Sequence, residues 1–170
     1  MSSLPVLVLN SGSSSIKFTV YETGDGARKK LLEGAVDGIG TDLGQFWMKD
    51  AQGKMLFNQA PALPNRSVAF KLVADSLHSG EFPAPLAIGH RTVCCSPTVC
   101  ENQRITPELI DEIDHYAALA PLHTPIGVYI MREALRLFPG IPNFSVLGRS
   151  VVHGRQDHGR RICGVGDYSV

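Results

Sequence analysis

The 170-residue sequence lacks an excess of either charge, because Lys plus Arg and Asp plus Glu both number 16. Zero net charge gives no support, by bulk electrostatics, to a nucleic-acid or membrane partner. No apolar run reaches the roughly 18 residues that indicate a membrane-spanning helix. The opening residues, MSSLPVLVLN, lack the basic region of a signal peptide, so we expect a cytoplasmic protein.

The four cysteines form no C-x-x-C pair, which argues against a zinc site. They are Cys94, Cys95, Cys100 and Cys163. In a reducing cytoplasm disulfides are also disfavoured, so we expect free thiols. The P-loop motif G-x-x-x-x-G-K-[S/T] is absent too. What is present is 44% apolar and 19% charged residues, typical of one ordinary globular domain with a real core.

The stretch that organises the chain is VLVLNSGSSSIKFTVYE. Val6–Leu9 predicts a buried strand, and the alternation over Ile16–Tyr21 predicts a half-buried strand after a tight turn. Backbone N–H groups and hydroxyls of a Ser/Gly turn can converge on an anion. With Lys17 just beyond the turn and the Asn10 amide just before it, a phosphate and its Mg²⁺ would find ligands within one hairpin. The alternative is an ordinary surface hairpin with a Ser/Gly turn.

Periodicity and breaker residues predict the other elements. After a polar turn over Thr23–Lys30, the expected strands are Leu31–Val36, Gln45–Lys49, Lys54–Asn58, Leu86–His90 and Asn143–Leu147. Three helices are expected: one over Asn65–Ser79 with Asn65 as N-cap and Gly80 as its end, one starting at Thr106-Pro107, and one running from Thr124-Pro125 to Pro139-Gly140, with both threonines as N-caps. Their expected apolar faces are Phe70, Val73, Ala74 and Leu77; Leu109, Ile110, Ile113 and Ala117; and Ile126, Ile130, Ala134 and Leu137.

Two more residues could contribute chemistry. Arg91 follows Leu86–His90 and would lie at the carboxyl end of a strand, where open α/β sheets bind ligands. Its planar guanidinium can bind a carboxylate or a phosphate through two parallel hydrogen bonds. The alternative is that Arg91 is a surface residue in a salt bridge. His123 precedes a helix N-terminus, where an anion is favoured, and its imidazole could donate to a phosphoryl oxygen. A histidine merely held in a Pro-bounded loop is the alternative there.

Three motifs, NSGSSSIK after a strand, GHRTVCCS and LAPLHTP, resemble the acetate kinase family (acetate and propionate kinases) in order and spacing. The segments ENQRIT and FPGIPNFSV resemble it as well, so the likeness covers about residues 5–147. The resemblance implies an α/β protein with the actin-like (acetate and sugar kinase) fold, here the N-terminal domain, a mixed sheet with helices. It implies reversible, Mg²⁺-dependent transfer of the ATP γ-phosphoryl group to acetate or propionate, and a homodimer for the full-length family. By position, the implied ligands are Asn10 for Mg²⁺, Ser13, Ser15 and Lys17 for ATP phosphates, Arg91 for the acetate carboxylate and His123 for the transferring phosphoryl group.

The departures from the family pattern lie in two stretches. Cys94-Cys95-Ser96 stands where the family has His-Gly-Gly, and Gly148 stands where it has a catalytic Asp. The family chain is also more than twice as long. We therefore expect an incomplete actin-like domain over 1–147 and a divergent, disordered tail over 148–170. Three hypotheses follow: a working acetate kinase, a truncated or frame-shifted inactive fragment, or a small actin-fold binding module.

Overall fold

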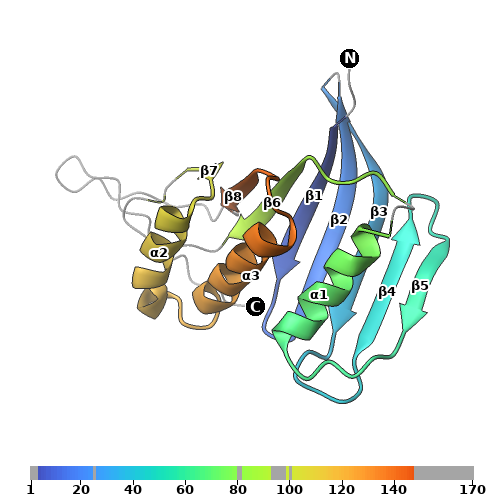
Figure 1. Cartoon of the computed structure of the whole chain (residues 1–170), viewed down its shortest axis with the longest axis horizontal. Coiled ribbons are helices and arrows are strands. Elements are labelled where there is room, and N and C mark those ends of the chain that lie inside the picture. The colour runs from blue at the N-terminus through green and yellow to red at the C-terminus, as the bar shows by residue number, and fades with distance from the viewer. Residues whose placement is uncertain (1–3, 25, 80–81, 93–98, 100, 148–170) are drawn as a thin grey trace, which may run out of the picture.

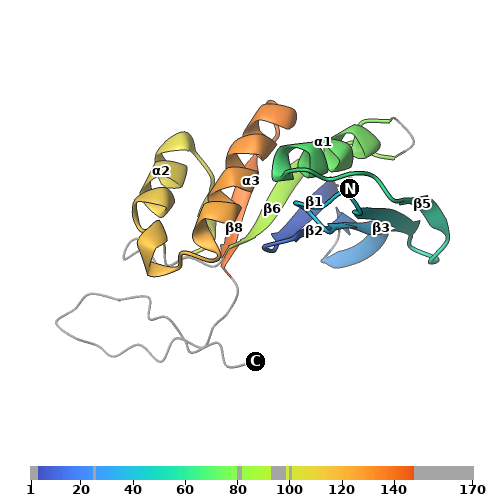
Figure 2. The same cartoon turned by 90° about the horizontal axis from the view of Figure 1, so that it is seen from below.

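The computed structural model describes residues 4–24, 26–79, 82–92, 99 and 101–147. These residues form one eight-stranded mixed sheet whose α-helices all lie on one side of it (Figures 1 and 2). The strands are β1 (Leu4–Ser11), β2 (Ser15–Gly24), β3 (Ala27–Asp37), β4 (Gln45–Asp50), β5 (Met55–Gln59), β6 (Ala87–Thr92), β7 (Gln103–Arg104) and β8 (Asn143–Leu147). The helices are α1 (Arg66–Leu77), α2 (Pro107–His115), α3 (Thr124–Leu137) and the 3₁₀ turn η1 (Ala117–Leu119).

The strand order is β5-β4-β3-β2-β1-β6-β8-β7. The first five strands form an antiparallel meander, and β6 and β8 then run parallel to β1. Helix α1 connects β5 to β6, and α3 precedes β8. Each of these helices runs antiparallel to the strand that follows it. The N-termini of α1 and α3 therefore lie near the edge where β1, β6 and β8 end. We call this the strand-end edge; it lies toward the lower left of Figure 1.

The sheet has a covered face, against which the helices pack, and an open face on the other side (Figure 2). Alternation along β1 shows the difference, because Leu7 and Leu9 are buried while Val8 between them is 36% exposed. The main core joins the covered face to α1 and α3. It includes Leu7, Leu9, Ile16, Phe18, Val20, Val36, Phe46, Ile88, Phe70, Val73, Ala74, Leu77, Ile130, Ala134 and Phe138.

The expected opening hairpin and the β4–β5 hairpin are confirmed, with β1 and β2 antiparallel from Leu4↔Thr23 to Ser11↔Ile16. The polar turn expected over Thr23–Lys30 is wrong for most of its length. The β2–β3 ladder continues to Gly24↔Ala27 instead, and the pair Glu22↔Lys29 places opposite charges across the two strands. Hydrophobic alternation alone thus predicted strands that are too short, because cross-strand pairing extends the β2–β3 hairpin beyond the apolar residues.

Helix α1 begins as predicted. The Asn65 side chain accepts a hydrogen bond from the Val68 N–H at 3.0 Å, and the predicted apolar face is buried. The helix ends at Leu77, where the N–H of His78 bonds to the Ala74 carbonyl. It therefore ends before Gly80, which lies outside the described residues.

Helix α2 also has its predicted cap, Thr106, whose hydroxyl accepts from the Leu109 N–H at 3.2 Å. It ends at His115, so Ala117 falls in η1 and only the other three predicted apolar residues are buried. The analogous cap for α3 is wrong. His123 occupies the N-cap position, and Thr124 is the first helical residue.

The reason for the different α3 start is the preceding η1 turn. The N–H groups of His123 and Thr124 both bond to the Ala120 carbonyl, at 3.1 and 2.9 Å, so the backbone supplies part of the cap. The Thr124 hydroxyl is buried and has no hydrogen-bond partner among the described residues. Besides Ile130 and Ala134, α3 buries Val128 and Met131 against α2, so the helix is covered on two sides. None of the described helices is long and apolar enough to cross a membrane.

Gly34 on β3 gives a direct test of how tightly the sheet packs around Phe18. It lies opposite Phe18 in the β2–β3 register, and a Cβ there would overlap the Phe18 ring and lie 2.6 Å from the Trp47 carbonyl oxygen. Gly34→Ala should lower the free energy of unfolding by about 1–3 kcal/mol, as overpacking does. Gly127→Ala is the control, because a Cβ on that α3 glycine meets nothing within 4 Å. Alanine should raise helix stability there by up to about 1 kcal/mol. Similar urea midpoints for the two variants would contradict the prediction.

Candidate functional site

The Ser/Gly turn joins β1 to β2 at the strand-end edge. The N–H of Gly12 bonds to the Ser15 carbonyl at 2.8 Å and closes the turn. The Ser14 carbonyl accepts from the Ile39 N–H at 3.0 Å. The N–H groups of Ser13 and Ser14 donate no backbone hydrogen bond within the described residues. The turn therefore offers two backbone donors at an exposed position, as an anion-binding turn requires.

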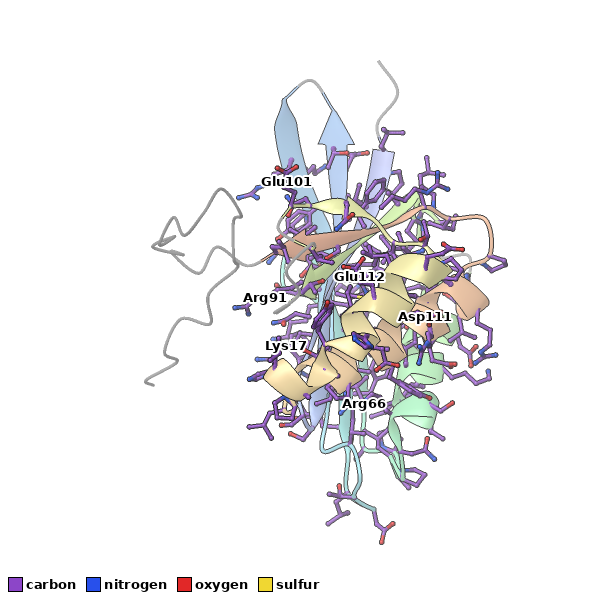
Figure 3. All side chains as sticks on the ribbon, turned by 90° about the vertical axis from the view of Figure 1, so that its left-hand side faces the viewer. Lys17, Arg66, Arg91, Glu101, Asp111 and Glu112 are labelled. Carbon is purple, nitrogen blue, oxygen red and sulfur yellow. The ribbon has the colours of Figure 1, made fainter. Side chains whose placement is uncertain are left out.

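Asn10, Lys17 and Arg91 point to the open face of the sheet. Asn10 pairs directly with Lys17 across β1 and β2. Leu9 pairs with His90 across β1 and β6, and both are buried on the covered face. The next residues along, Asn10 and Arg91, therefore lie side by side on the opposite face. Figure 3 shows Lys17 and Arg91 on the same side of the ribbon, turned away from the helices.

Both cations are exposed, and neither forms an ion pair with another described residue. The salt-bridge alternative for Arg91 thus gains no support from this part of the chain. Arg91 lies within β6, not after it, because the strand extends two residues beyond the predicted Leu86–His90. Backbone pairing with Val146 and the strand geometry, and not a loop, fix the direction of its side chain.

His90, directly before Arg91, is buried to 3% exposure and bonds through Nε2 to the Asn143 Oδ1 at 2.8 Å. Asn143 donates its Nδ2 to the Ile141 carbonyl, also at 2.8 Å, which orients the amide oxygen toward the histidine. The Nε2 atom must then carry the proton of the neutral imidazole. Burial lowers the pKa of His90 to about 4, although the hydrogen bond that His90 donates to Asn143 acts in the opposite direction. This pair joins β6 to β8 beneath Arg91.

His123 belongs to the helix layer, at the N-cap of α3, and its side chain is exposed. It therefore lies at the strand-end edge but is not on the open face with Lys17 and Arg91. That the three side chains reach one ligand stays a prediction. The dipoles of α1 and α3 point their positive ends toward the same edge, which favours an anion there.

The described residues hold no group of three or more His, Cys, Asp or Glu side chains that could bind a metal ion. Asn10 offers a single amide oxygen. That donor set does not fit a metal held by protein ligands alone, but it fits Mg²⁺, which keeps several waters and binds largely through substrate phosphates. The arrangement of two cations, one neutral oxygen and a turn with available N–H groups suits a phosphate anion with its magnesium.

A family model described as "Acetokinase family" matches residues 5–155. The chain belongs to the acetokinase family. It is 35% identical over 147 residues to acetate kinase 2 of Vibrio parahaemolyticus, covering 86% of this chain and 36% of that protein. It is 33% identical over 142 residues to an acetate kinase of Dichelobacter nodosus, covering 83% and 35%.

Solved acetokinase-family structures match as well. The crystal structure of Porphyromonas gingivalis acetate kinase superposes with a TM-score of 0.74 at 27% identity, over 85% of this chain and 37% of that one. A propionate kinase from Francisella tularensis gives the same TM-score and identity, over 85% and 36%. The actin-like N-terminal domain expected from the acetokinase resemblance is thereby confirmed. The chain spans little more than a third of the length of these relatives.

Several expectations fall outside the described residues. They concern the four cysteines, the Cys94–Ser96 departure, Gly148 at the catalytic Asp position, and the tail over 148–170. Conversely, two residues that support the candidate site were not singled out from the sequence. One is His90, whose place in the apolar alternation Leu86, Ile88, His90 could have indicated a buried side chain. The other is Arg66, an arginine at the first position of a helix, where the dipole disfavours a cation.

Proposed function

We propose that this chain carries the acetate- and phosphate-binding half of an acetate kinase site. The reaction is reversible: an acetate oxygen attacks the γ-phosphorus of ATP, the bond from that phosphorus to the β–γ bridging oxygen breaks, and acetyl phosphate and ADP result. The observation that carries the proposal is the placement of Asn10, Lys17 and Arg91 side by side on the open face, next to the Ser/Gly turn.

The roles follow from charge and position. Lys17 and the turn, with Ser13 and Ser15, hold ATP phosphates, and Arg91 holds the acetate carboxylate through its planar fork. His123 donates to the transferring phosphoryl group. Asn10 would bind Mg²⁺, which supplies neutralisation of the phosphate charge. Phosphoryl transfer depends mainly on such positioning and electrostatic stabilisation. The propionate kinase among the similar structures makes propionate the alternative acceptor.

A second candidate is an inactive fragment of an acetate kinase. It is favoured by Gly148, which stands where the resemblance to the family places a catalytic Asp. In this reading the chain binds phosphates without turnover. Binding and catalysis therefore need separate measurements.

Binding is tested at Lys17. Titration calorimetry with Mg·ATP should show affinity reduced roughly 10- to 100-fold in Lys17→Ala, since a hydrogen bond to a charged group contributes about 1.5–3 kcal/mol. Lys49→Ala is the matched control. Lys49 lies on β4 in the row Val8–Thr19–Glu33–Lys49 of the same open face, with its Nζ 5.2 Å from the Trp47 ring centroid. Its loss removes the same charge away from the turn and should leave affinity unchanged. Equal losses of affinity in the two variants would contradict a specific site at the turn and would indicate only general electrostatic attraction.

A further inference from the structure

Arg66 makes a contact that neither the helix nor the roles assigned above explain. It is the first residue of α1, yet a cation is unfavourable at the positive end of a helix dipole. Its guanidinium reaches back 53 and 54 residues to the Ser/Gly turn. Nη1 donates to the Gly12 carbonyl at 2.9 Å, and Nη2 donates to the Ser13 carbonyl at 2.5 Å.

These two hydrogen bonds fix the direction of two other groups. In a trans peptide the carbonyl and the next N–H point in opposite directions. No described peptide bond is cis. Because Arg66 holds the carbonyls of Gly12 and Ser13 toward α1, the N–H groups of Ser13 and Ser14 must point away from α1. These are the two N–H groups that donate no backbone hydrogen bond within the described residues.

We propose that Arg66 is a positioning residue for the phosphate-binding turn, holding its carbonyls on one side so that the Ser13 and Ser14 N–H groups face the phosphate on the other. The inference rests on the proposed function for the nature of the ligand, but the clamp itself is a property of the free protein. The fork geometry is essential, because one planar group must hold two successive carbonyls at once. A lysine ammonium at this position keeps the charge but not the paired, fixed donors.

The partial burial of Arg66 is consistent with its proposed role in holding the turn. Desolvation lowers the pKa of Arg66 from its ordinary value, with Tyr129 acting in the opposite direction. Two carbonyl oxygens thus compensate a cation that is partly removed from water. The remaining carbonyl of the turn, on Ser14, is held separately by Ile39. Three successive carbonyls of the turn are therefore bonded to the protein.

The test compares Arg66→Lys and Arg66→Met with the native chain, using ¹⁵N relaxation of the turn and titration with Mg·ATP and with pyrophosphate. In the native chain the order parameters of Ser13 and Ser14 should be near about 0.85, and in Arg66→Met they should fall below about 0.6. Mg·ATP and pyrophosphate affinities should fall about tenfold in both variants. Arg66→Lys, which retains the charge and most of the stem, keeps the test valid if Arg66→Met fails to fold.

Arg136→Lys and Arg136→Met are the controls, because Arg136 pairs with Glu133 on the exposed side of α3. They should change neither the turn nor the affinities. Unchanged order in the turn of the Arg66 variants would overturn the proposal, including the case where affinity falls, since Arg66 would then act only as a charge. Binding of neither ligand by the native chain would instead remove the proposed function. Loss of order in Arg66→Met would still establish the clamp.

Discussion

The purified 170-residue chain, supplied with ATP, Mg²⁺ and acetate, is expected to form acetyl phosphate more slowly than about 1 s⁻¹, the lower end for ordinary enzymes. Lys17 and Arg91 are both exposed on the open face, where water weakens the contact of Lys17 with phosphate and of Arg91 with the acetate carboxylate. The chain spans about 36% of the length of its relatives. The described residues form a single sheet whose open face carries no helix, so nothing in this part of the chain excludes water from a ligand there. Gly148 also stands where the resemblance to the family places a catalytic Asp.

The expected deficit is large because several contributions are missing together. Loss of one electrostatic group often reduces a rate by about 10²–10³. Hydroxamate trapping of acetyl phosphate measures the product, with Lys17→Ala as the control for contaminating activity and a full-length acetate kinase, such as the Vibrio parahaemolyticus relative, as the positive control. Turnover near 1 s⁻¹ that Lys17→Ala abolishes would show that this part of the site suffices, and the inactive-fragment candidate would be rejected.

The second large effect is a loss of stability at low pH that depends on His90. Its imidazole is buried in the neutral form, and its pKa falls from 6.5 to about 4 on folding. The unfolded chain therefore binds one more proton than the folded chain between those values, and stability falls as pH is lowered through that window. The contribution is fully present above pH 6.5. Across the window it amounts to about 3 kcal/mol, at 1.36 kcal/mol per pKa unit.

Urea denaturation between pH 4 and 7.5 measures this contribution when the native chain is compared with His90→Gln. The variant cannot titrate at this position, so the difference in unfolding free energy between the two chains should change by about 3 kcal/mol over the window. His115→Gln removes an exposed histidine of α2 and is the control. Parallel pH profiles for the native chain and His90→Gln would contradict the prediction.

Much of the fold follows from local sequence patterns. The β1–β2 hairpin, the Asn65 and Thr106 caps and the β8 strand were all predictable, because each depends on residues within about one turn or one strand. The Thr124 cap was mispredicted because the Ala120 carbonyl, directly after η1, supplies the backbone acceptor. The extra two residues of β6 come from pairing with β8, which begins 51 positions after Thr92.

The candidate site likewise combines features that local sequence predicts with contacts between distant segments. Asn10, Lys17 and Arg91 were identified from short motifs, and strand register brings them together. The contacts from Arg66 to the turn and from His90 to Asn143 each join residues more than 50 positions apart. No local pattern specifies such pairs, because they exist only after the sheet and helices have assembled.

The two faces of the sheet have a consequence for evolution. The apolar residues that stabilise the domain lie on the covered face, while Asn10, Lys17 and Arg91 lie on the open face. Natural selection for folding and natural selection for the proposed phosphate binding would therefore act on alternate residues of the same strands. Surface substitutions away from special features usually change stability by only about 0.5 kcal/mol. A lineage can thus lose or rebuild its ligand chemistry one open-face residue at a time while the inherited domain continues to fold.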